Sequence, residues 1–161
     1  MAIEIEKKFL VKGEDWKKGC SSKVYYQGYL CSGSGQTVRV RIAGEDAWLT
    51  IKGRATNISR LEFEYPLPLE DARTLLDQVC QHPIIHKRRF FKEYKGFTWE
   101  IDEFYGENQG LVLAEIELES EDQQFAKPDW LGEEVSHDNR YYNASLRSYP
   151  YSMWKGEEKN S

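Results

Sequence analysis

Charged side chains of one sign recur two residues apart along this chain, with apolar residues between them. The pairs are Glu4/Glu6, Arg39/Arg41, Glu62/Glu64, Lys87/Arg89, Glu100/Asp102 and Glu115/Glu117. Because side chains in a strand point alternately to opposite faces, each pair lies on one face of a strand. Two like charges roughly 6.6 Å apart repel by ~2.5 kcal/mol at an effective dielectric of about 20. One such pair is typical of the solvent face of an antiparallel sheet, but six pairs, each of one sign, indicate a functional surface.

The alternation predicts eight strands, at about residues 2–11, 23–32, 36–43, 46–53, 58–67, 84–95, 97–105 and 111–119. Turn-forming sequences separate several of them, namely "SGSGQ" at 32–36, "AGED" at 43–46 and Lys95-Gly96. Such short links join antiparallel neighbours.

Three helical segments interrupt the strands. A short one is predicted at 14–18, and the most regular one covers 68–81, where an apolar stripe follows Pro68 and two acidic residues. A third is predicted at 136–148, with Ser136 or Asp138 as its capping residue. Residues 1–148 are therefore expected to form a single domain, and residues 149–161, which end in "KGEEKNS", a flexible tail.

Two arrangements of the strands satisfy the pattern. The charged faces lie in solvent if the apolar faces form a core between two sheets. Alternatively, the eight strands close into a barrel, with the charges pointing into the lumen and the apolar faces outward under the helices. Charges of both signs lining one lumen would hold an anion and a cation together.

Composition limits the function. A net charge of −5 and a pI of about 5.3 argue against a general nucleic-acid-binding protein. No apolar run is long enough to span a membrane. Cys20, Cys31 and Cys80 are odd in number and far apart, as expected for reduced thiols of a cytoplasmic protein. The oligomeric state is not fixed by the sequence, which leaves a homodimer open.

The two charge sets suit one kind of ligand. Clustered carboxylates without histidine or cysteine favour hard cations such as Mg²⁺ or Mn²⁺. Arginine forks and lysine ammonium groups bind phosphate oxygens. Together they favour a metal-bound polyphosphate as a small-molecule substrate. The glycine-rich "SGSGQ" lacks the following GK[ST] of a P-loop and is interpreted as a hairpin turn.

The ordered motifs resemble the CYTH-domain family, the triphosphate tunnel metalloenzymes. Glu4, Glu6 and Lys8 fit its ExExK signature, and the remaining motifs follow in order over about residues 2–146: "TVRVRI", "LTIKGR", "SRLEFEYPLPL", "HKRRF", "WEIDEF", "LVLAEIELE" and "SHDNRYYNASL". The resemblance implies a mostly β, α+β fold: a closed eight-stranded antiparallel barrel, or tunnel, with a charged lumen and flanking helices. It implies metal-dependent hydrolysis of inorganic tripolyphosphate. Alternatives are a class IV adenylate cyclase, a nucleotide or thiamine triphosphatase and, less favoured, a non-catalytic polyphosphate-binding module.

The same resemblance implies roles for individual residues. The implied ligands of Mg²⁺ or Mn²⁺ are Glu4, Glu6, Glu115 and Glu117. The implied phosphate-binding residues are Lys8, Arg39, Arg41, Lys52, Lys87 and Arg89, with Arg140 and Tyr141 at one end of the tunnel. Glu62 and Glu64 would hold a second metal or position the attacking water, and form the catalytic set with Lys8.

Overall fold

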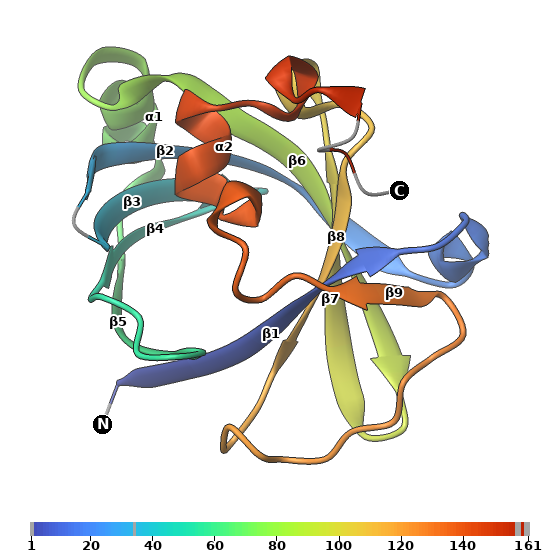
Figure 1. The fold of residues 1–161 in the computed structure, drawn as a ribbon. Coiled ribbons are helices and arrows are strands. Elements are labelled where there is room, and N and C mark those ends of the chain that lie inside the picture. The colour runs from blue at the N-terminus through green and yellow to red at the C-terminus, as the bar shows by residue number, and fades with distance from the viewer. Residues whose placement is uncertain (1, 34, 157–158, 160–161) are drawn as a thin grey trace.

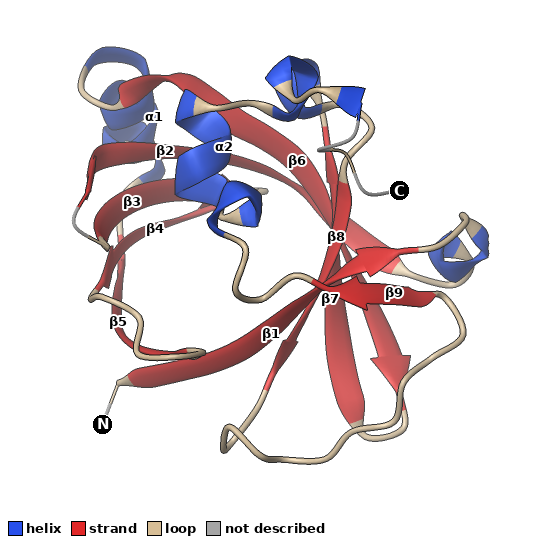
Figure 2. Cartoon of the chain, viewed as in Figure 1, coloured by secondary structure: helices blue, strands red, loops and turns tan. Residues whose placement is uncertain are grey.

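The computed structural model describes residues 2–33, 35–156 and 159, and strands are the main regular element among them (Figure 1, Figure 2). The strands are β1 (Ile3–Val11), β2 (Ser21–Gly33), β3 (Gln36–Ala43), β4 (Asp46–Lys52), β5 (Ser59–Pro66), β6 (Gln81–Tyr94), β7 (Phe97–Phe104), β8 (Val112–Glu117) and β9 (Leu131–Glu134). The helices are α1 (Leu69–Gln78) and α2 (Asn143–Ser148), with 3-10 turns η1 (Asp15–Lys17), η2 (Gly106–Asn108), η3 (Asn139–Tyr141) and η4 (Tyr151–Met153). None of the helices in these ranges is long and apolar enough to cross a membrane.

Eight of the strands close into an antiparallel barrel, as predicted. They are ordered β5-β4-β3-β2-β6-β7-β8-β1, and the pairing of β1 with β5 closes the ring. The closing pair is short, because β5 covers only Ile3–Ile5 of β1. Further along the same edge of β1, Phe9 and Val11 pair with β9, a ninth strand that the sequence did not predict.

The hairpin links follow the predicted turn chemistry. Lys95 and Gly96 have φ of 46° and 87°, so both residues of this two-residue turn lie in the left-handed region that such hairpins require. Gly44 in the "AGED" turn has φ of 63°. The turn at 32–36 includes Ser34, which lies outside the described residues.

Strand register places the charged side chains on the inner face of the barrel. Lys8 lies opposite Glu115 on β8, and Lys52 lies opposite Glu62 on β5. The outer face carries apolar side chains such as Phe63, which is 39% exposed. Of the two arrangements consistent with the sequence, the barrel with inward charges is therefore the one observed.

Two apolar clusters cover parts of the outer wall. Helix α1 packs on β3 and β4, where Ala72 and Leu76 meet Val40. This close approach requires Gly28 on β2, because a Cβ there would lie 2.9 Å from both Leu76 Cδ2 and Cys80 Cβ. The second cluster surrounds Trp99 on the outer face of β1, β7 and β8.

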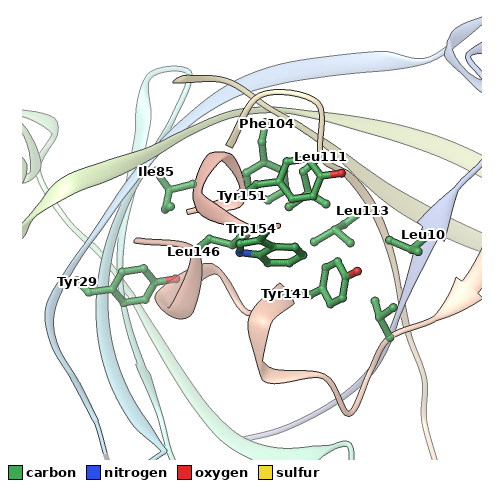
Figure 3. Close-up of a cluster of buried hydrophobic side chains, with 11 residues drawn as sticks. Leu10, Tyr29, Ile85, Phe104, Leu111, Leu113, Tyr141, Leu146, Tyr151 and Trp154 are labelled. Atoms are coloured by element: carbon green, nitrogen blue, oxygen red, sulfur yellow. The ribbon is translucent and has the colours of Figure 1, made fainter. Parts of the chain in front are cut away.

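A third cluster, here called the end plug, closes one end of the lumen (Figure 3). On the inner face of some strands the side chains change from charged to apolar, as from Lys8 to Leu10 on β1. Against these apolar ends pack residues from the C-terminal part of the chain. The end plug consists of Leu10, Tyr29, Ile85, Phe104, Leu111, Leu113, Val135, Tyr141, Leu146, Tyr151 and Trp154.

The C-terminal region differs from the prediction in two ways. The helix expected at 136–148 is reduced to η3 and α2, because Tyr142 between them is extended, with φ −71° and ψ 137°. Asp138 does act as a cap, since its side chain accepts a hydrogen bond from the Arg140 amide. The fold also continues beyond residue 148. Tyr151 and Trp154 are buried, because their aromatic rings pack against the apolar side chains at this end of the barrel.

Candidate active site in the barrel lumen

The lumen is a cavity of about 1030 Å³. Twelve of the charged residues predicted for the site line it: Glu4, Glu6, Lys8, Arg39, Arg41, Lys52, Glu62, Glu64, Lys87, Arg89, Glu115 and Glu117. Glu100 lines it as well. The period-two spacing therefore identified a set of side chains that eight strands bring together.

A buried carboxylate joins two cations of the lumen. Asp102 on β7 is fully buried and accepts a hydrogen bond from Lys87 Nζ at 2.7 Å. It also accepts two from Arg89, Nε to Oδ1 at 2.7 Å and Nη2 to Oδ2 at 2.8 Å. Arg89 reaches further to Glu115 at 3.1 Å and to Glu100 at 3.3 Å. This fork-to-carboxylate geometry fixes the guanidinium group in one orientation.

The arginines of β3 donate hydrogen bonds to neutral side chains, and Arg39 also lies near one carboxylate. Arg41 Nε donates to Gln27 Oε1 at 3.0 Å, and its guanidinium carbon lies 4.8 Å from the ring centre of Tyr25. Arg39 Nη2 donates to Thr50 Oγ1 at 3.0 Å and lies 3.7 Å from Glu64. Arg39 Nε is buried without a hydrogen-bond partner among the described residues. This part of the wall thus keeps positive charge that an anion could neutralise.

The acidic residues gather where β1 meets β5 and β8. Lys52 Nζ lies 3.1 Å from Glu4 and 3.3 Å from Glu62. Burial, reinforced by the charges of Glu115 and Glu4, raises the pKa of Glu6 well above its ordinary value. Burial likewise raises the pKa of Glu4, because the charged form of a carboxyl group is poorly solvated there.

The cations are shifted in both directions. Burial, followed by the charges of Arg89 and Arg41, lowers the pKa of Lys87 to about 7, although Asp102 opposes this shift. Burial and the charges of Arg39 and Arg89 lower the pKa of Arg41 to about 10. Against the effect of burial, Glu115 raises the pKa of Lys8 and Asp102 raises that of Arg89, so carboxylates compensate these two cations more fully than Lys87 and Arg41.

The carboxylates fit a hard cation by their chemistry, because all are oxygen donors that repel one another without one. However, no three acidic, histidine or cysteine side chains of the described ranges already converge as a metal-binding group. Mg²⁺ commonly uses one or two carboxylates together with phosphate oxygens and water. The site thus suits a cation that shares its ligands with a bound phosphate chain.

Two predicted substrate-binding residues do not line the lumen. Tyr141 is fully buried in the end plug. Arg140 pairs with Asp138 at 2.6 Å, and its guanidinium carbon lies 4.8 Å from the ring centre of Trp154. The prediction assumed a continuous helix at 136–148, whereas the extended Tyr142 sets these two residues and the following Asn143 in different directions.

Other residues of the lumen were missed. Tyr25 on β2 lines the lumen, and the buried Gln27 on the same strand contacts Arg41 of the lumen, but neither belongs to a charge pattern. Asn143 enters the lumen from the start of α2. Gln27 could have been identified only from its pairing with Arg41 across β2 and β3.

Known proteins share this arrangement over nearly the whole chain. Residues 2–147 match the model of the CYTH domain. An inorganic triphosphatase of Acetivibrio thermocellus is 48% identical over 155 residues, covering 96% of this chain and 99% of that protein. An inorganic triphosphatase of Nitrosomonas europaea is 34% identical over 147 residues, covering 89% of this chain and 95% of that protein. A crystal structure described as an inorganic triphosphatase has a TM-score of 0.65 at 31% identity, covering 89% of this chain and 96% of the other. The chain belongs to the CYTH-domain family.

Proposed function

We propose that this protein hydrolyses inorganic tripolyphosphate inside the barrel lumen, with Mg²⁺ or Mn²⁺ as cofactor. The observation that carries the proposal is a barrel lumen lined both by lysine and arginine side chains and by a group of carboxylates. The relatives named inorganic triphosphatase support the same reaction class.

The cationic wall would bind the phosphate chain. Its members are Lys8, Arg39, Arg41, Lys52, Lys87 and Arg89. Because Asp102 fixes Lys87 and Arg89 in place beforehand, little orientational freedom is lost when the anion binds. Ammonium and guanidinium groups in place before reaction also stabilise the charge that develops on the departing phosphate.

The carboxylates would hold the cation. Glu4, Glu6, Glu115 and Glu117 supply oxygen donors on β1 and β8, and Glu6 lies opposite Glu117 in the strand register. A cation held there would supply positive charge that offsets the charge developing on the phosphate chain during hydrolysis.

Glu62 and Glu64 would position the attacking water, with Lys8 completing the catalytic set. Burial acts to raise the pKa of Glu62, but its hydrogen bonds and the charges of Lys52 and Arg39 keep this pKa below its ordinary value. Glu62 is therefore a carboxylate at neutral pH. A carboxylate accepts a proton from water as the phosphorus–oxygen bond forms. The end plug limits access of bulk water to the inner lumen.

Phosphate release from tripolyphosphate, ATP and thiamine triphosphate, each with Mg²⁺ and with Mn²⁺, tests the proposal. We expect tripolyphosphate to give the highest kcat/KM. A preference for ATP or thiamine triphosphate would identify a nucleotide or thiamine triphosphatase, and cyclic AMP formed from ATP would identify a cyclase; each contradicts the proposal.

A non-catalytic polyphosphate-binding module is the remaining alternative. Glu6→Gln keeps the size of the side chain but removes a proposed cation ligand. We expect it to abolish turnover while tripolyphosphate still binds; unchanged turnover would remove the metal assignment, and binding without turnover in the wild type would favour the module.

We further propose a homodimer. Five apolar side chains lie exposed on the outer wall formed by β1, β4 and β5: Ile3, Ile51, Leu61, Phe63 and Tyr65. They present about 450 Å² at about 200 Å² per large side chain, over half of the ~800 Å² per partner of a standard interface. Light scattering should show that the wild type is a dimer and that Phe63→Asp dissociates it. Met153→Asp is the control, because Met153 is exposed outside this wall, and it should leave the dimer intact. A monomeric wild type would refute the proposal.

We place the protein in the cytoplasm. The support is that Cys20, Cys31 and Cys80 are all free thiols and that Cys31 is exposed, which suits a reducing compartment. Fractionation of the native cells tests this location.

A further inference from the structure

A single amide oxygen from the C-terminal part of the chain serves two buried donors of the cationic wall. Asn143, the first residue of α2, accepts a hydrogen bond from Lys87 Nζ at 2.8 Å and from Gln27 Nε2 at 2.9 Å. Lys87 is 1% exposed and Gln27 is fully buried. The two donors come from β6 and β2. Asn143, which belongs to a helix and not to the sheet, therefore bridges two strands of the barrel.

The bridge belongs to a longer chain of hydrogen bonds. On one side, Gln27 Oε1 accepts from Arg41 Nε at 3.0 Å. On the other, Lys87 donates to Asp102, which also accepts from Arg89. Three cations from β3 and β6 are thus connected through one residue of α2. Loss of the amide at residue 143 would remove a hydrogen bond from both donors, leaving Gln27 Nε2 with Tyr29 Oη at 3.3 Å and Lys87 Nζ with Asp102.

The chemistry of an asparagine at this position is specific. A neutral amide orients Lys87 without cancelling its charge, whereas a second carboxylate beside Asp102 would neutralise it. Lys87 has three N–H groups, and its acceptors among the described residues are Asp102 and Asn143. One N–H therefore remains for a ligand in the lumen, which Lys87 lines.

We infer that Asn143 is a positioning residue, which fixes Lys87 directly and Arg41 through Gln27 in the orientation that receives a phosphate chain. The inference rests on the proposed function for the identity of the anion. The low pKa values of Lys87, about 7, and of Arg41, about 10, agree with a cluster that is oriented but not neutralised. An asparagine that only attached α2 to the barrel would affect stability alone.

Steady-state kinetics with tripolyphosphate separates these two roles. Asn143→Ala should raise KM about 10-fold to 100-fold, the range for one hydrogen bond to a charged group, with kcat changed less. The matched control is Gln78→Ala, because Gln78 is an exposed amide at the end of α1, outside the lumen. All assays are run well below each variant's melting temperature, so that lost stability does not lower the active fraction. An unchanged KM for Asn143→Ala, or an equal rise for Gln78→Ala, would overturn the inference.

A second measurement does not depend on turnover. Asn143→Asp places a carboxylate beside Lys87 and should raise the pKa of Lys87 by about one to three pH units. NMR titration of labelled lysine in the ligand-free protein reports this pKa, with Lys87→Arg assigning the signal. If the wild type does not hydrolyse tripolyphosphate but the lysine signal shifts, the proposed function fails while the bridge is supported. If turnover is present and neither KM nor the lysine signal responds, the inference fails and the proposed function stands.

Discussion

Replacing Asp102 by asparagine should destabilise the protein strongly and increase its affinity for a polyanion. The fully buried carboxylate accepts three short hydrogen bonds from Lys87 and Arg89. Removing one partner of a buried ion pair leaves an uncompensated charge and costs about 3–5 kcal/mol. For a chain of this size, each kcal/mol lowers the melting temperature by about 2–4 °C. Asp102→Asn should therefore melt roughly 6–20 °C below the wild type.

The same substitution makes the lumen more positive, so the anion should recover more stability than in the wild type. Ligand at a hundred times Kd stabilises a protein by about 2.7 kcal/mol, and tighter binding raises this figure at equal concentration. Thermal melts with and without tripolyphosphate measure both effects. Glu100→Gln is the control, because its partly exposed pair with Arg89 at 3.3 Å is worth under about 1 kcal/mol. The reasoning is refuted if Asp102→Asn melts like the wild type, or if tripolyphosphate stabilises it less.

Four further outcomes are expected. Because the folded pKa of Lys87 is about 7 and its ordinary value is 10.5, the unfolded chain binds more protons between these values; the stability of the wild type relative to Lys87→Met should rise from pH 7 to pH 10 in urea melts, and a fall would contradict the burial argument. Metal affinity measured by calorimetry should increase with pH around the raised pKa of Glu6 and lose that dependence in Glu6→Gln, since the cation displaces a proton. Gly28→Val should cost about 1–3 kcal/mol because α1 must move away from β2, and a neutral effect would mean that α1 is loosely attached. Trp154→Ala should cost about 3–5 kcal/mol, whereas a residue in a flexible tail would cost almost nothing.

The barrel and its charged lumen were predictable because one physical rule covers both. Alternation with period two fixes which side chains share a face, so Glu4 and Glu6 reach the lumen together with Lys8. Closure was not fixed by the alternation alone, since a two-sheet arrangement satisfies it too. The identification of the family supplied that step.

The residues that escaped prediction lack such a rule. Gln27 and Asn143 are neutral and lie far apart in sequence, so nothing local marks them as neighbours of Lys87. Arg140 and Tyr141 were assigned by the family resemblance alone; Tyr141 does lie in the end plug, whereas Arg140 pairs with Asp138. Strand β9 has only four residues and pairs at one edge of β1, too short for alternation to be detected.

Because of the end plug, the lumen is open at one end only. Trp154, Leu146 and their neighbours fill the far end with hydrocarbon, which gives a charged molecule no passage there (Figure 3). Tripolyphosphate must then enter, and both products must leave, through the opposite end of the lumen. Pyrophosphate that is still bound therefore prevents the next tripolyphosphate from binding.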